Sequence, residues 1–268
     1  MTYSPAPITP LDAAHAAMQD NPQDDAARLR YFARLADGAL FLLLEAEAQG
    51  DTLSPRVFPL EDGPVVLAFD TEERLAAFTG AVAPYAQLPG RVIAGQLAGQ
   101  GIGLGINLGV ADSAFLLPPD ALGWLVGTLA QAPQRVDGRP VSVHAPGALP
   151  EGLLSALAEK FGPLGAILRA AAVAGVVYDD GRRGHMLALL DARSGAQDAL
   201  ARAAAEALAF SGIEAGEMDV VFLGRDDALA RAMLGAGVRL DIPEPSAPEP
   251  GAPPAAPGMD PARPPILR

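Results

Sequence analysis

A short alternation of residues most strongly constrains what this chain can fold into. Five aliphatic residues alternate strictly with Gly101, Gly103, Gly105, Asn107 and Gly109 between positions 101 and 110. A period of two predicts a β-strand, here with one aliphatic face and one face almost bare of side chains. Glycine weakens a strand, so another group is expected to approach the bare face closely. That group is either a helix of the same domain or a ligand or partner chain, and the second option makes these five residues candidate binding residues.

The rest of the chain alternates between strand and helix patterns, which predicts an α/β fold with mixed sheets. The continuously apolar run Ala39–Ala46 is typical of a strand buried on both faces. Thr9-Pro10-Leu11-Asp12 has the order of a helix start, with a capping threonine, a proline and then an acid. A helix from Gly195 to Phe210 carries a regular apolar stripe.

A polar, turn-rich stretch at residues 132–139 predicts a division into two domains, 9–131 and 140–242. The second domain shows the order β-α-β-β-α-β, which resembles a ferredoxin-like sandwich by analogy of fold. From position 243 onward, ten of the 26 residues are proline. Such a segment buries too little apolar surface to offset its ordering entropy, so residues 243–268 are predicted to form a disordered tail, with docking as a polyproline helix as the alternative.

Charge excludes several kinds of partner. The chain has 32 acidic and 19 basic residues, a net charge of −13. Nucleic acids and anionic membrane surfaces attract basic proteins, so neither is an expected partner. Residues 92–111 carry no charge, but their glycines make a membrane-spanning helix a poor interpretation, and no membrane insertion is expected. The first ten residues do not have the pattern of a secretory signal, which makes the cytoplasm the expected location.

The usual catalytic and metal-binding patterns are not present in the sequence. There is no cysteine, and the single lysine, Lys160, is followed by Phe161 rather than by the serine or threonine of a phosphate-binding loop. The glycine alternation lies in a predicted strand, whereas dinucleotide binding needs glycines in a turn that opens a helix. His15, His144 and His185 are far apart in sequence and lack ligand spacing. The sequence therefore predicts no enzyme activity, no cofactor and no metal.

Several segments of the first half resemble the SseB (enhanced serine sensitivity) family. They are Arg28–Leu35, Phe41–Leu44, Arg56–Leu60, Val65–Phe78, and Gly105–Gly109 with Phe115–Leu117. The resemblance covers about residues 24–131, and Met218–Ile242 is weakly similar to the family's C-terminal domain. It implies a bacterial protein whose family has no settled enzymatic activity, so it supplies no catalytic residue.

We therefore expect a non-catalytic binding or regulatory module with an unidentified protein partner. A secretion-associated accessory or chaperone-like protein and a small-molecule enzyme that uses the glycine-lined strand are the alternatives. An enzyme should bring polar residues with shifted pKa values together in a deep pocket. A binding module should instead expose an apolar patch, near Gly101–Gly109 or on the helix that contains Leu122.

Overall fold

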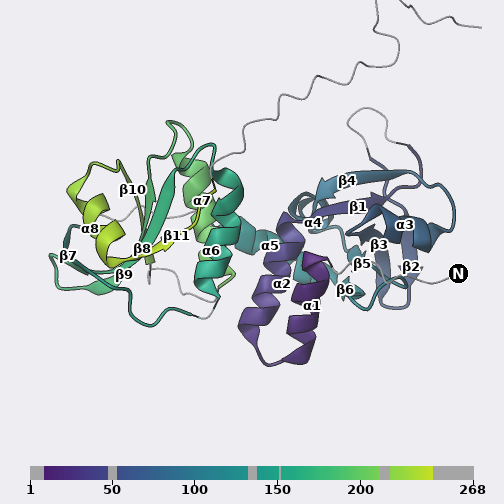
Figure 1. Ribbon diagram of the computed structural model, residues 1–268. Helices are drawn as coiled ribbons and strands as arrows, with labels where there is room; N and C mark the ends of the chain where they lie inside the picture. Colours follow the sequence, from purple (N-terminus) through teal and green to yellow (C-terminus); the bar gives the residue numbers. More distant parts are fainter. Residues whose placement is uncertain (1–8, 48–52, 132–137, 151, 212–217, 244–268) are drawn as a thin grey trace, which may run out of the picture.

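The computed structural model describes residues 9–47, 53–131, 138–150, 152–211 and 218–243. It has two mixed sheets with helices on their faces, which confirms the expected α/β class (Figure 1). Residues 244–268, which hold almost all of the predicted tail, lie outside the described residues. None of the helices in the described part of the chain has the length and hydropathy that crossing a membrane requires.

The first half contains one sheet with helices on both faces. Its elements, in chain order, are α1 (Pro10–Asp20), α2 (Asp25–Asp37), β1 (Ala39–Leu43), β2 (Val57–Leu60), β3 (Gly63–Phe69), α3 (Glu72–Thr79), β4 (Tyr85–Pro89), α4 (Gly90–Leu97), β5 (Gly103–Ile106), β6 (Phe115–Leu117) and α5 (Pro119–Leu129). The strand order is β4-β1-β3-β5-β6, and β2 pairs with the first part of β3. Only β3 and β5 run parallel among these pairs.

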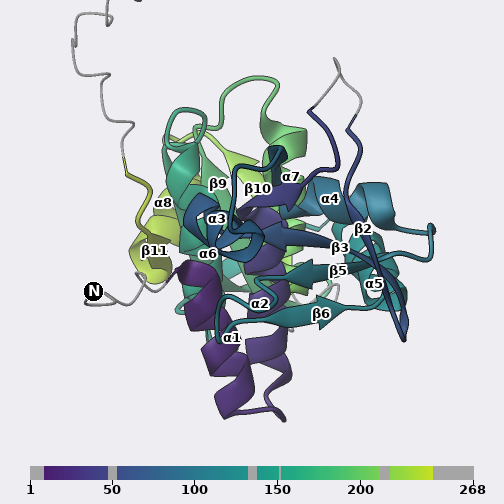
Figure 2. The ribbon, with the colours of Figure 1, turned by 90° about the vertical axis from the view of Figure 1, so that its right-hand side faces the viewer.

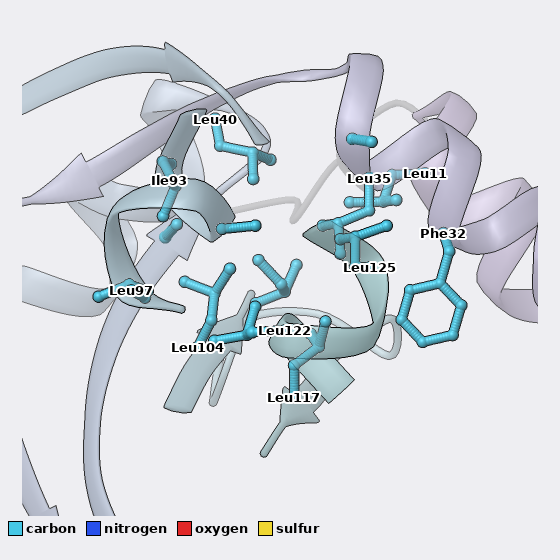
Figure 3. Packing of buried hydrophobic residues seen from close by; sticks show 14 of the residues in the cluster. Leu11, Phe32, Leu35, Leu40, Ile93, Leu97, Leu104, Leu117, Leu122 and Leu125 are labelled. Carbon is cyan, nitrogen blue, oxygen red and sulfur yellow. The ribbon is translucent and has the colours of Figure 1, made fainter. Parts of the chain in front are cut away.

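The larger core of this half lies between the sheet and the helices α1, α2, α4 and α5. Leucines from β5, β6, α4 and α5 meet there, as Figure 3 shows for Leu97, Leu104, Leu117 and Leu122. A smaller cluster covers the opposite face of the sheet under α3. The sheet is therefore buried on both faces, which explains the continuous apolar run in β1.

Two sequence predictions need correction in this half, and one is confirmed. β4 was not predicted; it is an edge strand of alternating exposed and half-buried residues next to β1. The strand expected from Gly101 to Val110 is only β5, because Asn107 adopts φ +52° and ends the extended backbone. The helix cap predicted at Thr9 is confirmed, with Thr9 and Asp12 bonding each other's backbone N–H groups.

The second half is a three-layer arrangement. It comprises β7 (Pro140–His144), α6 (Leu153–Phe161), the short 3-10 helix η1 (Gly162–Leu164), β8 (Ala170–Tyr178), β9 (Arg183–Leu190), α7 (Gln197–Ala209), β10 (Met218–Leu223), α8 (Ala228–Ala236) and β11 (Val238–Leu240). Helices α6 and α7 pack on one face of the sheet and α8 on the other. The sheet order is β10-β9-β8-β11, with β7 also paired to β8.

This order differs from the ferredoxin-like arrangement suggested by the sequence. The crossover through α7 places β10 directly beside β9 and parallel to it. A ferredoxin-like sheet splits that βαβ unit with another strand. The order of elements along a chain does not specify which strands become neighbours, so the analogy gave the elements but not the topology.

The two halves meet along a junction formed by α2, α4 and α5 from the first and α6 and α7 from the second (Figures 1 and 2). Phe210, at the end of α7, is buried in the main core of the first half. Arg34 on α2 pairs with Glu159 on α6. Four further charged side chains, which we call the junction quartet, also meet there: Asp37, Arg91, Lys160 and Glu206. Arg91 and Lys160 each pair with both acids, and Lys160 Nζ lies 2.8 Å from Asp37 and 2.6 Å from Glu206.

Candidate functional site

The glycines of β5 are explained by close packing within the first half. A side chain at Gly103 would place its Cβ 2.9 Å from the carbonyl oxygen of Leu117. At Gly105 the Cβ would lie 2.5 Å from Leu108 and 2.7 Å from Leu67. Both glycines are buried, and the chain's own Leu108 covers the bare face. Of the two options for the bare face of the strand, close internal packing is the one that the structure shows at Gly103 and Gly105.

The other three predicted site residues shape the turns around β5. Gly101, Asn107 and Gly109 all have positive φ, at +71°, +52° and +75°. Gly101 and Gly109 are exposed, whereas Asn107 is fully buried. The structure thus divides the five residues between a strand interior and its flanking turns, and a binding role for them stays a prediction.

Asn107 belongs to a buried polar cluster at the carboxyl ends of β3 and β5. Its side-chain oxygen accepts a hydrogen bond from the Asp70 backbone N–H at 3.1 Å, and its amide donates to Ser113 at 3.2 Å. Ser113 in turn donates to Asp12 on α1. Ligands of open α/β sheets bind at the carboxyl ends of parallel strands, so this is where a site would be sought first.

The centre of the cluster is the guanidinium of Arg74. It lies 2.6 Å from Asp12 and 2.7 Å from Asp70, and Asp70 also accepts from the Thr9 hydroxyl at 2.6 Å. Burial alone would raise the pKa of Asp12, but hydrogen bonds from Arg74 and Ser113 hold it far below its usual range. The hydrogen bond to Asp12 likewise raises the pKa of Arg74, against the effect of burial. Groups so firmly ionised and mutually paired hold structure together and do not exchange protons near neutral pH.

The sequence analysis placed Asp12 at a helix start and did not predict this cluster. The N-cap of α3 is Thr71, and Asp70 faces Arg74 one helical turn away. The spacing of Asp70 and Arg74, four residues apart, was the available signal. No pattern links Asp12 to Arg74, because 62 residues separate them.

The histidines have different surroundings. His15 is buried, and its ring lies 5.7 Å from that of Tyr31 and 5.9 Å from that of Phe115. Burial lowers its pKa, so it is neutral at pH 7. His144 and His185, far apart in sequence, both lie opposite Gly175 on β8. Across the residues that the structure describes, however, three potential metal ligands do not come together anywhere.

The surface of α4 and α5 is notable for carrying very few charged residues. Asp112 and Asp120 are the only charged residues between Val92 and Gln131. The two helices pack side by side, and Trp124 on α5 is 45% exposed although its ring lies 5.0 Å from Phe32. Six exposed residues of this pair are uncharged, and we call them the charge-poor surface: Val92, Gly95, Gln96, Gly123, Trp124 and Gly127. Asp120, which is also exposed, lies in the first turn of α5.

Comparison with known proteins gave one match. Residues 11–124 match the family model described as SseB protein N-terminal domain. Neither a curated protein nor a solved structure matched the chain. The resemblance predicted for the first half is confirmed, while the match does not reach the segment Met218–Ile242. By this match, residues 11–124 are similar to the SseB N-terminal domain.

Proposed function

We propose that this chain is a non-catalytic protein-binding module whose partner contacts the charge-poor surface. The observation that carries the proposal is the exposure of Trp124 in a region with almost no charge. Tryptophan is the residue type most enriched among the energetically dominant residues of protein interfaces. A partner that covers an uncharged surface also avoids the desolvation of charged groups.

Two strongly perturbed titratable groups, Asp12 and Arg74, support a binding role over a catalytic one. Asp12 and Arg74 are bound to each other and to Ser113 and Asp70. Two open hollows of the described residues, each about 280 Å³, are lined by residues other than Asp12 and Arg74, and the shifted groups that line one of them, Asp191 and Arg225, are paired with each other. A catalytic site would instead place shifted groups where a substrate can reach them.

The test introduces one charge into the surface without disturbing the fold. Gly127 lies on α5, and a side chain there would meet nothing within 4 Å. Gly127→Arg should therefore fold normally and abolish binding, because a partner would bury the guanidinium without a counter-ion. Gly235→Arg is the matched control, since Gly235 also lies on a helix, α8, with open space around it.

The full chain, tagged, is used to capture proteins from native lysate, and stoichiometric partners are identified by mass spectrometry. Val92→Arg on α4 and the exposed Val141→Arg on β7 form a second pair. The proposal expects Gly127→Arg and Val92→Arg to lose the partner that both control variants keep. A partner retained by all four variants, or lost only with the controls, would refute it.

A further inference from the structure

A hollow in the second half lies where three strands end. β9, β10 and β11 run in the same direction, since β9 and β10 are parallel and both β9 and β11 are antiparallel to β8. The hollow has a volume of about 280 Å³ and touches the last residues of β9 and β11, Leu190 and Leu240. The carboxyl edge of a sheet is the usual place for ligands in α/β proteins. No part of the SseB match covers this region.

The wall of the hollow combines an apolar floor with a cationic rim. The floor includes Ala171, Leu190, Leu234 and Leu240. The rim is formed by Arg225 and Arg239 together with Asp191, which pairs with Arg225. Both arginines are exposed, in a chain whose net charge is −13. A few polar groups around an apolar floor are the usual composition of a small-molecule site.

The two arginines differ in how much of their hydrogen-bonding capacity is used. Arg225 pairs with Asp191, and Asp226 also lies near it. Arg239 donates from Nε to the Leu234 carbonyl at 3.1 Å, and no carboxylate of the described residues lies within 4.0 Å of it. Arg239 lines the hollow, and its outer nitrogens are therefore available as donors for an anion.

The backbone at this edge is also unusual. Asp191, directly after β9, has φ +50°; outside glycine, only Asn107 shares a positive φ within the described ranges. Its N–H donates to the carbonyl of Leu223, and its carboxylate accepts from the Arg225 N–H, both at 3.0 Å. Asp191 thus ties the ends of β9 and β10 together and holds Arg225 at the rim. Strained residues of this kind concentrate at functional sites.

We propose that this hollow binds a small aliphatic carboxylate, with its carboxylate on Arg239 and Arg225 and its hydrocarbon part on the leucine floor. A volume near 280 Å³ is just below the roughly 300–1,000 Å³ of typical small-molecule sites, so the ligand is short. The guanidinium fork matches the geometry of a carboxylate, and the floor selects against small inorganic anions. This inference does not depend on the proposed protein-binding function.

Titration calorimetry of the full chain tests the proposal with hexanoate as the probe, and with hexanol and inorganic phosphate as comparisons. Hexanoate should bind, and both comparisons should bind at least about tenfold more weakly, the size expected for one charge-assisted contact. Arg239→Gln should weaken hexanoate binding by about the same factor. Arg231→Gln, an exposed arginine of α8 outside the hollow, should leave the affinity unchanged.

Other outcomes would overturn the proposal. Equal binding of hexanol would show that the arginines do not select an anion, and equal binding of phosphate would remove the role of the floor. Binding that survives Arg239→Gln and Arg225→Gln would place the ligand elsewhere. Absence of hexanoate binding to the full chain, with all variants folded as judged by their melting curves, would refute the site.

Discussion

Among single residues, Gly103 is one whose replacement the neighbouring backbone opposes directly. An added Cβ would meet the carbonyl oxygen of Leu117 on β6, a backbone atom that cannot rotate away. We expect Gly103→Ala to lower the free energy of unfolding by about 1–3 kcal/mol, as overpacking of a core does. Urea unfolding of the full chain measures the change.

Gly95 on α4 is the matched control, because a Cβ there would meet nothing within 4 Å. Replacing a helical glycine with alanine in open space removes a helix-propensity penalty of about 1 kcal/mol, so Gly95→Ala should be neutral or stabilising. Equal destabilisation by the two substitutions would contradict the packing explanation for the glycines of β5.

Asp12 predicts a dependence of stability on pH. Because its pKa is lower in the folded chain than in the unfolded chain, its ionised form stabilises the fold above the unfolded pKa near 3.8. That contribution is lost as the pH falls below this value. Asp12→Asn should therefore be less stable than the natural chain at pH 6, and the difference should shrink as the pH falls from 5 toward 3. Urea unfolding at several pH values measures it, and a difference independent of pH would exclude the ion pair with Arg74 as its source.

Among the elements, those with strong local patterns could be predicted and those defined by their neighbours could not. The helix α7 and the hairpin of β8 and β9 follow from apolar periodicity and a turn rich in aspartate and glycine. β4 has no such signal; it is a strand because β1 offers it an edge. The polar cluster around Arg74 joins residues more than sixty positions apart, and contacts at that distance leave no trace in a local pattern.

The junction quartet is a contact between elements that can be tested by chemical labelling of one of its members, Lys160. Glu206 on α7 is only 9% exposed and bonds both Arg91 and Lys160. Glu206→Gln removes the charge between these two cations, which should weaken the contact by about 1.5–3 kcal/mol. Loss of the ion pair with Glu206 should leave Lys160 more reactive, so its rate of acylation by an amine-reactive ester should rise. Lys160 is the only lysine in the chain, so the label reports on this contact alone among lysines.

Mass spectrometry separates acylation at Lys160 from acylation of the N-terminal amine. Glu159→Gln is the control: Glu159 is the exposed neighbour of Lys160 and pairs with Arg34, outside the quartet. An unchanged rate at Lys160 in Glu206→Gln, or an equal increase in both variants, would show that the quartet does not restrain the junction.

In the whole molecule, Phe210 couples the two halves. It is 4% exposed and packs in the core of the first half although it follows a helix of the second. We expect the natural chain to unfold in a single calorimetric transition. Phe210→Ala should cost about 3–5 kcal/mol and separate the unfolding of the halves into two transitions. A single transition that only shifts to lower temperature would show that other contacts are sufficient for coupling.

The position of Trp124 has an optical consequence. It is the chain's only tryptophan, and its ring lies 5.0 Å from Phe32 of the first half and 6.4 Å from Phe210 of the second. The tryptophan fluorescence of the protein therefore originates at the junction between the halves, within the charge-poor surface. A partner that covers the indole would shift the emission to the blue, whereas separation of the halves would admit water and shift it to the red. One unlabelled spectrum thus distinguishes the two events by the direction of its change.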